Sequence, residues 1–140
     1  MGKVGVFIKT ASGILATSVA LLTALRENPQ IAEGIDSAID KLKKATNSQN
    51  PKLRFDAKLA AIVAAADAVE QTFPGAPEPA GWRRQAQALR VRGELAWHSN
   101  TGGHRRKAMK ALNAETAEVL SQVNTRLIDL QGTFSPELDA

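Results

Sequence analysis

The feature that most constrains the fold of this chain is a spacing of three or four residues between apolar side chains, which recurs along most of its length. This spacing puts apolar side chains on one face of an α-helix, whereas a half-buried strand needs strict alternation, and no alternating run is present. The clearest stretch alternates steps of four and three through Phe55, Leu59, Ile62, Ala66, Val69 and Phe73. The sequence therefore predicts an all-α protein.

Five amphipathic segments can be delimited. They predict helices over approximately residues 4–26, 30–46, 51–73, 80–98 and 103–131. Helices with one apolar face can bury it only against each other, so we expect an antiparallel bundle of four to five helices. The chain of 140 residues has the size of a single domain, spanning residues 1–140.

Turn-forming residues separate these segments. Asn50 followed by Pro51 is typical of a helix start, with an N-cap and then proline at the first helical position. The Pro- and Gly-rich residues 74–81 predict a stiff connector, and Gly102-Gly103 a turn between the last two helices. Residues 132–140 predict a flexible acidic tail.

The stretch from Thr10 to Leu25 carries no charge and has three interpretations. Its sixteen residues are fewer than the roughly 20 that span a bilayer, and no good small-x-small cleavage site follows. The sequence favours an amphipathic core helix, with an interfacial membrane helix and a signal or anchor as alternatives. Without a convincing signal and without cysteine, a cytoplasmic location is expected, with membrane association as the alternative.

Composition excludes several kinds of site. The absence of Cys excludes disulfides, a thiol nucleophile and Cys-ligated zinc or iron–sulfur sites. The absence of Tyr and an aromatic content of 4% argue against a base-stacking platform for single-stranded nucleic acid. We expect no cofactor.

The net charge of +4 is concentrated in one segment. Residues 1–81 have a balance of +1, residues 82–110 a balance of +7, and residues 111–140 a balance of −4. The basic residues 82–110 therefore offer a surface to an acidic partner or to the chain's own acidic tail.

Ten residues form the predicted binding surface: Arg83, Arg84, Arg90, Arg92, Trp97, His104, Arg105, Arg106, Lys107 and Lys110. Arg83, Arg90 and Trp97 follow at steps of seven on one helix face, where a guanidinium can stack on the indole and either cover it or form part of a ligand surface. The cations from His104 to Lys107 oppose the dipole of the last helix, which would favour an anion at that helix start.

The inventory of catalytic side chains is thin. Glu94 and His98 share a helix face and His104 lies across the turn, but the surrounding cations would repel a divalent ion, so no metal is expected. The carboxylate pairs Asp36/Asp40 and Asp67/Glu70 are interpreted as solvated faces. No serine sits in a nucleophile elbow. We therefore expect no enzymatic activity.

The sequence favours a non-enzymatic helical interaction or adaptor protein that binds an acidic protein partner through residues 83–110. One alternative is a peripheral membrane protein that uses its N-terminal helix and this basic surface. Another is non-specific nucleic-acid binding, which the low total charge and the lack of a recognition motif disfavour. The spacing in the last helix also permits a homo-oligomer. In general character the chain resembles small Ala- and Arg-rich helical bacterial proteins.

Overall fold

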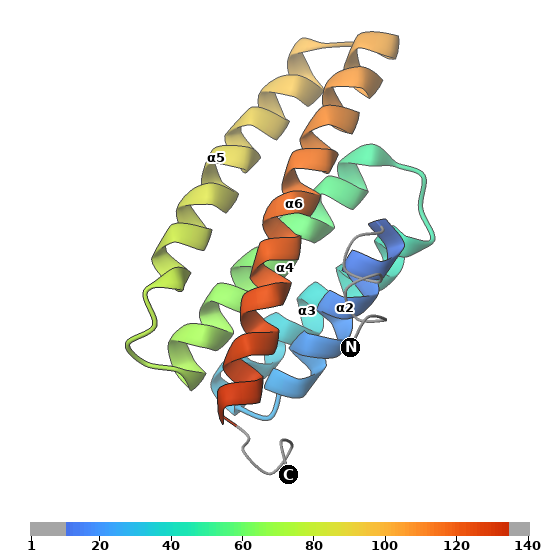
Figure 1. The fold of residues 1–140 in the computed structure, drawn as a ribbon. Coiled ribbons are helices and arrows are strands. Elements are labelled where there is room, and N and C mark those ends of the chain that lie inside the picture. The colour runs from blue at the N-terminus through green and yellow to red at the C-terminus, as the bar shows by residue number, and fades with distance from the viewer. Residues whose placement is uncertain (1–10, 135–140) are drawn as a thin grey trace.

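A computed structural model describes residues 11–134, which form five helices and contain no strand. The helices are α2 (Ala11–Leu25), α3 (Pro29–Thr46), α4 (Pro51–Thr72), α5 (Glu78–Ser99) and α6 (Gly102–Phe134). Helices adjacent in sequence run in opposite directions (Figure 1). The predicted all-α bundle is confirmed.

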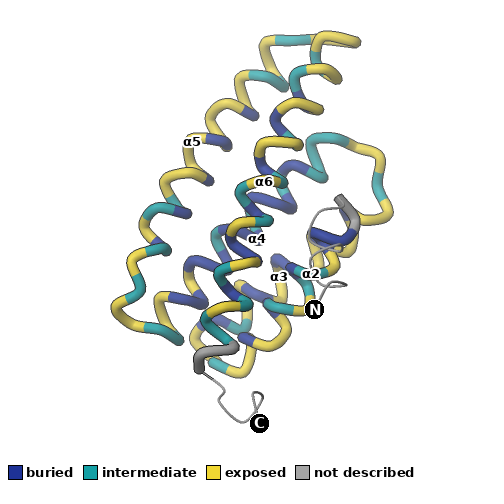
Figure 2. Tube along the Cα trace, viewed as in Figure 1, coloured by how far each residue is buried: buried dark blue, intermediate teal, exposed yellow. Residues whose placement is uncertain are grey.

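The Ala-rich helix α4 is the centre of the bundle and packs against each of the other four helices. Its small side chains let neighbours approach from several directions, so Ala61, Ala65 and Ala68 are all buried, as are Phe55 and Ile62. The inward faces of the surrounding helices are buried against it, while their outer faces are exposed (Figure 2).

The apolar faces predicted from the helical period form this core. Outside α4 the buried members are Leu15, Leu22, Leu25, Ile31, Ile35, Ala38, Leu42, Trp82, Ala86, Leu89, Met109, Leu112, Leu120, Val123 and Leu127. Two buried polar residues are matched to each other, since Ser18 donates a hydrogen bond of 3.0 Å to Asn124. The two α3 carboxylates that were interpreted as a solvated face form ion pairs at the surface. Asp36 pairs with Arg26, and Asp40 pairs with Lys44.

Asparagine caps set two of the helix starts. The Asn28 side chain accepts from Gln30 N at the start of α3. At the start of α4, the Asn50 side chain accepts from the backbone N–H groups of Lys52 and Leu53 at 2.9 and 3.3 Å. In both helices proline follows the cap, where its missing N–H costs nothing.

Two predicted boundaries differ from the structure by two residues or more. The connector predicted over residues 74–81 ends at Pro77, because α5 begins at Glu78 and its first turn accommodates Pro79. Gly132 does not end the last helix, which continues to Phe134 and takes up the first residues of the predicted tail. The remaining tail, and residues 4–10 of the first predicted helix, lie outside the described residues.

The N-terminal uncharged stretch is used inside the bundle. Leu15, Ser18 and Leu22 are almost completely buried, which supports the core-helix interpretation of the described part. None of the helices in residues 11–134 combines the length and the apolar character needed to cross a membrane.

The hairpin of α5 and α6 extends beyond the first turn of α4 (Figure 1). Gly93 packs on the Phe55 ring, and Glu94 forms an ion pair of 3.0 Å with Lys52, near the start of α4. Gly102, with a φ of 54°, turns the chain into α6. We call residues 95–108 the hairpin end.

Candidate binding surfaces on α4, α5 and α6

Arg83 of the predicted basic surface is neutralised by α4. Its Nη1 lies 2.8 Å from Glu70 Oε2 and its Nη2 lies 2.7 Å from Asp67 Oδ1. The hydrogen bond and charge of Arg83 lower the pKa of the Glu70 carboxyl. Asp67 and Glu70 are both exposed, as the interpretation of a solvated face predicted, and Arg83 joins them across the contact of α4 and α5.

Arg92 is neutralised by α6. It makes a two-pronged contact with Glu115, with N–O distances of 2.6 and 2.7 Å. The hydrogen bonds from Arg92 lower the pKa of the Glu115 carboxyl. Arg83 and Arg92 thus hold the helices together and are not free for a partner.

Trp97 is covered by Arg105 of α6 and not by an arginine of its own helix. The Arg105 guanidinium carbon lies 4.4 Å from the centre of the indole ring. Arg105 Nε also donates a hydrogen bond of 3.0 Å to the Asn100 carbonyl, which fixes the side chain at the turn. Spacing within one helix could not predict this contact, because the antiparallel return of α6 creates it.

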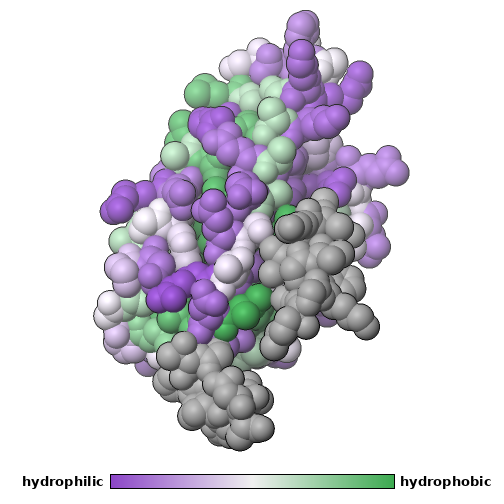
Figure 3. Space-filling view, viewed as in Figure 1, coloured by the Kyte–Doolittle hydropathy of each residue, from purple (hydrophilic) through white to green (hydrophobic). Residues whose placement is uncertain are grey.

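Four further residues of the predicted surface are exposed and have no ion-pair partner among residues 13–131, namely Arg84, Arg90, His104 and Lys107. Near them, Val91 and Leu95 are the exposed large apolar residues, with 50% and 60% of their surfaces open. Hydrophobic surface is visible over the upper part of α5 (Figure 3).

The exposed apolar residues belong to one outer face of α5. Arg84, Ala88, Val91 and Leu95 follow at steps of four, three and four, and all are exposed. We call these four residues the α5 outer face. Because the residues that face α4 and α6 are offset from them around the helix, no element in the described part of the chain covers this face.

The last two predicted residues, Arg106 and Lys110, line a cavity of about 500 Å³ between α4 and α6. Arg54 and Lys58 of α4 line the opposite side, so four cations surround one space. The remaining lining residues are uncharged: Gln49, Pro51, Asn113, Ala114 and Ala117. In the described part of the chain, none of the four cations has a carboxylate partner. We call this space the basic cavity.

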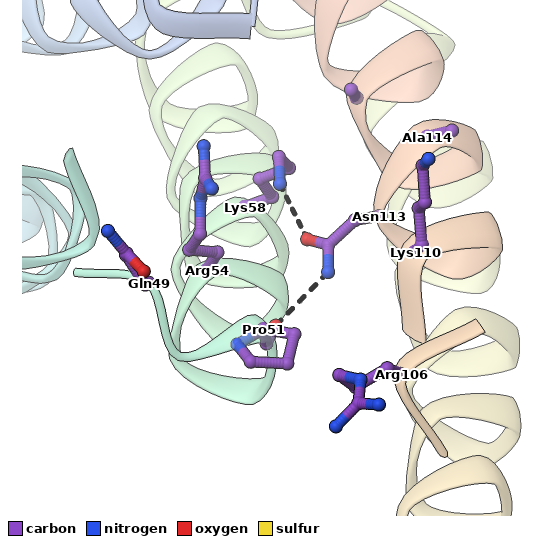
Figure 4. A pocket seen from close by; sticks show the side chains of 9 residues that line it. Gln49, Pro51, Arg54, Lys58, Arg106, Lys110, Asn113 and Ala114 are labelled. Atoms are coloured by element: carbon purple, nitrogen blue, oxygen red, sulfur yellow. Dashed lines mark hydrogen bonds between the residues drawn. The ribbon is translucent and has the colours of Figure 1, made fainter. Parts of the chain in front are cut away.

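Lys58 is the most unusual group in the basic cavity. It is only 5% exposed, and its Nζ donates a hydrogen bond of 2.6 Å to Asn113 Oδ1. Burial, together with the charge of Arg54, lowers the pKa of the Lys58 ammonium to about 8. Lys58 and Asn113 point toward each other across the cavity, with Arg54 on the α4 side and Lys110 on the α6 side (Figure 4).

Asn113 is held in one orientation by backbone carbonyls from two helices. Its Nδ2 donates to Pro51 O at 3.1 Å and to Met109 O at 3.0 Å. The amide oxygen therefore faces Lys58, and the cavity wall between the two helices is fixed.

The α4 half of the cavity was missed by the sequence analysis. Its signal was present, because Lys58 lies between Ala57 and Leu59 in a segment that is apolar around most of the helix, and Arg54 precedes it by one turn. Like charges four residues apart on a helix repel, so the pair of Arg54 and Lys58 is unfavourable unless a negatively charged group binds between them. Charge counts over long segments concealed it, since residues 1–81 are nearly balanced.

The residues considered for catalysis do not assemble. His98 lies 3.2 Å from Glu94, whose second oxygen is engaged by Lys52, and His104 has no partner among the described residues. No group of three His, Asp or Glu side chains within residues 11–134 could hold a metal ion.

The described structure thus offers two candidate binding surfaces. One is the α5 outer face, which exposes apolar side chains, and the other is the basic cavity, whose cations have no carboxylate partner among the described residues. No protein-family model, curated protein or solved structure matches the chain. Any function must accordingly be inferred from these residues and their geometry.

Proposed function

We propose that this protein is a non-enzymatic interaction module, and that its partner is an acidic amphipathic helix of another protein docked on the α5 outer face. The observation that carries the proposal is the exposure of Val91 and Leu95, one turn apart, on a helix face that no described element covers. Exposed apolar side chains in a row are costly in water and are typical of surfaces that bind a partner.

The spacing of the α5 outer face suits a helical partner. Steps of four, three and four from Arg84 to Leu95 form the kind of stripe into which a second helix packs its own apolar side chains. Ala88 in the middle of the stripe lets that helix approach closely.

The charges around the stripe favour an acidic partner. Arg84 begins the stripe and has no carboxylate partner in the described chain, whereas Glu94, beside the stripe, is already held by Lys52. Arg83 and Arg92 are already paired, so the partner's carboxylates would meet Arg84. Such complementarity selects the partner and speeds its association.

A designed peptide tests the proposal. The probe is a helical peptide with leucine at its inward positions and glutamate at the flanking positions, and the comparison peptide carries lysine in place of every glutamate. Titration calorimetry should show saturable binding of the acidic peptide, at least about tenfold tighter than that of the basic peptide. Equal affinity for both peptides contradicts the acidic partner.

Paired variants locate the surface. Val91→Gln with Leu95→Gln should lower the affinity for the acidic peptide by about tenfold or more, as expected when two apolar anchors are lost from an interface. Ala20→Gln with Ala24→Gln, on the exposed side of α2, is the control and should leave the affinity unchanged. If both double variants bind like the parent chain, the partner does not dock on the α5 outer face.

A further inference from the structure

The basic cavity differs from the ion-paired contacts that α4, α5 and α6 make with one another. Lys52 is paired with Asp56 and Glu94, Arg83 with Asp67 and Glu70, and Arg92 with Glu115. The same helices therefore supply carboxylates at these three contacts, whereas no carboxylate of the described residues pairs with a cation of the cavity.

Four positive charges around one space repel each other and destabilise the fold unless an anion enters. The cost is greatest for Lys58, because its ammonium is almost completely buried and has one uncharged oxygen as its partner. A protonated lysine has three N–H donors, so two remain for another acceptor. Burial of an unpaired ammonium is unfavourable, which makes this residue the strongest sign of a missing ligand.

We propose that the basic cavity between α4 and α6 is a binding site for a small organic phosphate. The site is separate from the α5 outer face and does not depend on the function proposed for that face. A phosphate group carries about two negative charges near neutral pH and three acceptor oxygens, which suits four cations better than the single charge of a carboxylate. Arg54 and Arg106 lie on opposite walls and each offers a planar set of donors of the kind that binds phosphate oxygens.

The volume and the uncharged lining indicate that the ligand is larger than inorganic phosphate. About 500 Å³ lies within the range of sites for small organic molecules. Pro51, Ala114 and Ala117 provide an apolar wall beside the cations. The phosphate would face Lys58 and the arginines, and an apolar or planar organic group would lie along the alanines.

Calorimetry on the full chain tests this site with phenyl phosphate as the probe, and with inorganic phosphate and benzoate for comparison. Phenyl phosphate should bind with one ligand per chain, about tenfold or more tighter than either comparison compound. Absence of saturable binding up to about 10 mM, or equal affinity for benzoate, overturns the proposal.

Substitutions on both walls separate a built site from general surface charge. Arg54→Gln with Arg106→Gln should lower the affinity for phenyl phosphate by at least about tenfold. Arg84→Gln with Arg90→Gln removes the same charge from α5 and should change the affinity less than about twofold, so equal losses in the two double variants contradict the cavity. Circular dichroism confirms that each variant is folded, and the Asn113 side-chain amide signal in NMR spectra of the parent chain should shift on binding.

The source of the phosphate is decided with vesicles. Phosphatidylcholine vesicles that contain phosphatidic acid should sediment the protein, and release bound phenyl phosphate, only if the ligand is a lipid headgroup. If the protein stays in the supernatant while phenyl phosphate binds, the ligand is a soluble phosphate ester. Sedimentation that persists in the Arg54→Gln, Arg106→Gln variant would contradict a role of the cavity in lipid binding.

These outcomes are independent of the proposed partner helix. Val91→Gln with Leu95→Gln should leave phenyl phosphate binding unchanged, and Arg54→Gln with Arg106→Gln should leave the acidic peptide bound. Each proposal can therefore fail while the other survives.

Discussion

The ammonium of Lys58 lies 2.6 Å from the amide oxygen of Asn113 and has no carboxylate partner among the described residues. Lys58 lies inside α4, the helix that forms the centre of the bundle. A buried side chain that lowers the stability of the bundle is expected where the residue serves binding and not stability.

Replacement of Lys58 by methionine should stabilise the unliganded protein. The lowered pKa means that the folded state disfavours the ammonium by on the order of 1–3 kcal/mol, and methionine keeps the apolar stem without the charge. Urea unfolding near neutral pH measures the gain. Lys43→Met, on the exposed face of α3, is the control and should have little effect.

The same lysine should make stability depend on pH. Below its folded pKa of about 8 both states hold the proton and the full penalty is present. As pH rises from about 8 toward the ordinary value of 10.5, the folded state loses its proton first, so the parent chain gains stability relative to Lys58→Met. The groups that face Lys58 are Arg54 from α4 and Arg106, Lys110 and the uncharged Asn113 from α6. A constant difference between the two proteins over this interval would contradict the buried ammonium.

Two glycine-to-alanine changes should have opposite effects. A methyl group on Gly93 would collide with the buried Phe55 ring, so Gly93→Ala should destabilise the protein by about 1–3 kcal/mol. Gly34 is exposed inside α3 with open space around it, so Gly34→Ala should stabilise by about 0.5–1 kcal/mol. Thermal unfolding of the two variants checks both signs, and an unchanged unfolding midpoint for Gly93→Ala would show that the packing of α5 on α4 is not specially close.

Removal of Arg83 should matter more than removal of its neighbour. Arg83 joins Asp67 and Glu70 across two helices, whereas Arg84 has no partner in the described chain. Arg83→Gln should lower the unfolding midpoint in low salt, and Arg84→Gln should not. Arginine holds the pKa of Glu70 below its usual range, so this stabilisation is present at neutral pH and is lost as acid protonates the carboxyl. A difference that persists in 1 M salt would rule out an electrostatic cause.

Arg105→Gln should expose Trp97 to solvent. The guanidinium 4.4 Å from the ring shields one indole face, and the contact at an open site is worth about 0.5–1 kcal/mol. Iodide quenching of fluorescence is the measurement, with Trp82 replaced by phenylalanine so that Trp97 alone reports. Arg90→Gln is the comparison variant and should leave the quenching unchanged, so a larger effect from it than from Arg105→Gln would contradict the Arg105–Trp97 contact.

The helical period was sufficient to predict the buried faces, because each face depends on spacing within one helix. Leu15, Phe55, Trp82 and Met109 are all buried where that spacing placed them. The prolines explain why α5 begins before its predicted start, since a first turn tolerates Pro79 as well as a connector does.

The candidate sites required contacts between helices, and the sequence predicted them only in part. The basic segment was recognised, but its pairing with Asp67, Glu70 and Glu115 depends on neighbours that are distant in sequence. Likewise, Arg106 faces Arg54 only because α6 lies beside α4. The spacing of residues along one helix predicts the face on which a side chain lies. It does not predict which residue of another helix lies opposite that side chain.

The extension of α5 and α6 beyond α4 makes the length of the hairpin a separate variable from the packing of the core. Residues 95–108 lie past the Gly93–Phe55 contact, so whole turns could be added to or removed from both helices in register while that contact stays in place. Each turn would move the Trp97–Arg105 stack outward or inward by about 5.4 Å. The length of the hairpin can therefore change by insertion or deletion of whole turns while the packing of the core stays the same.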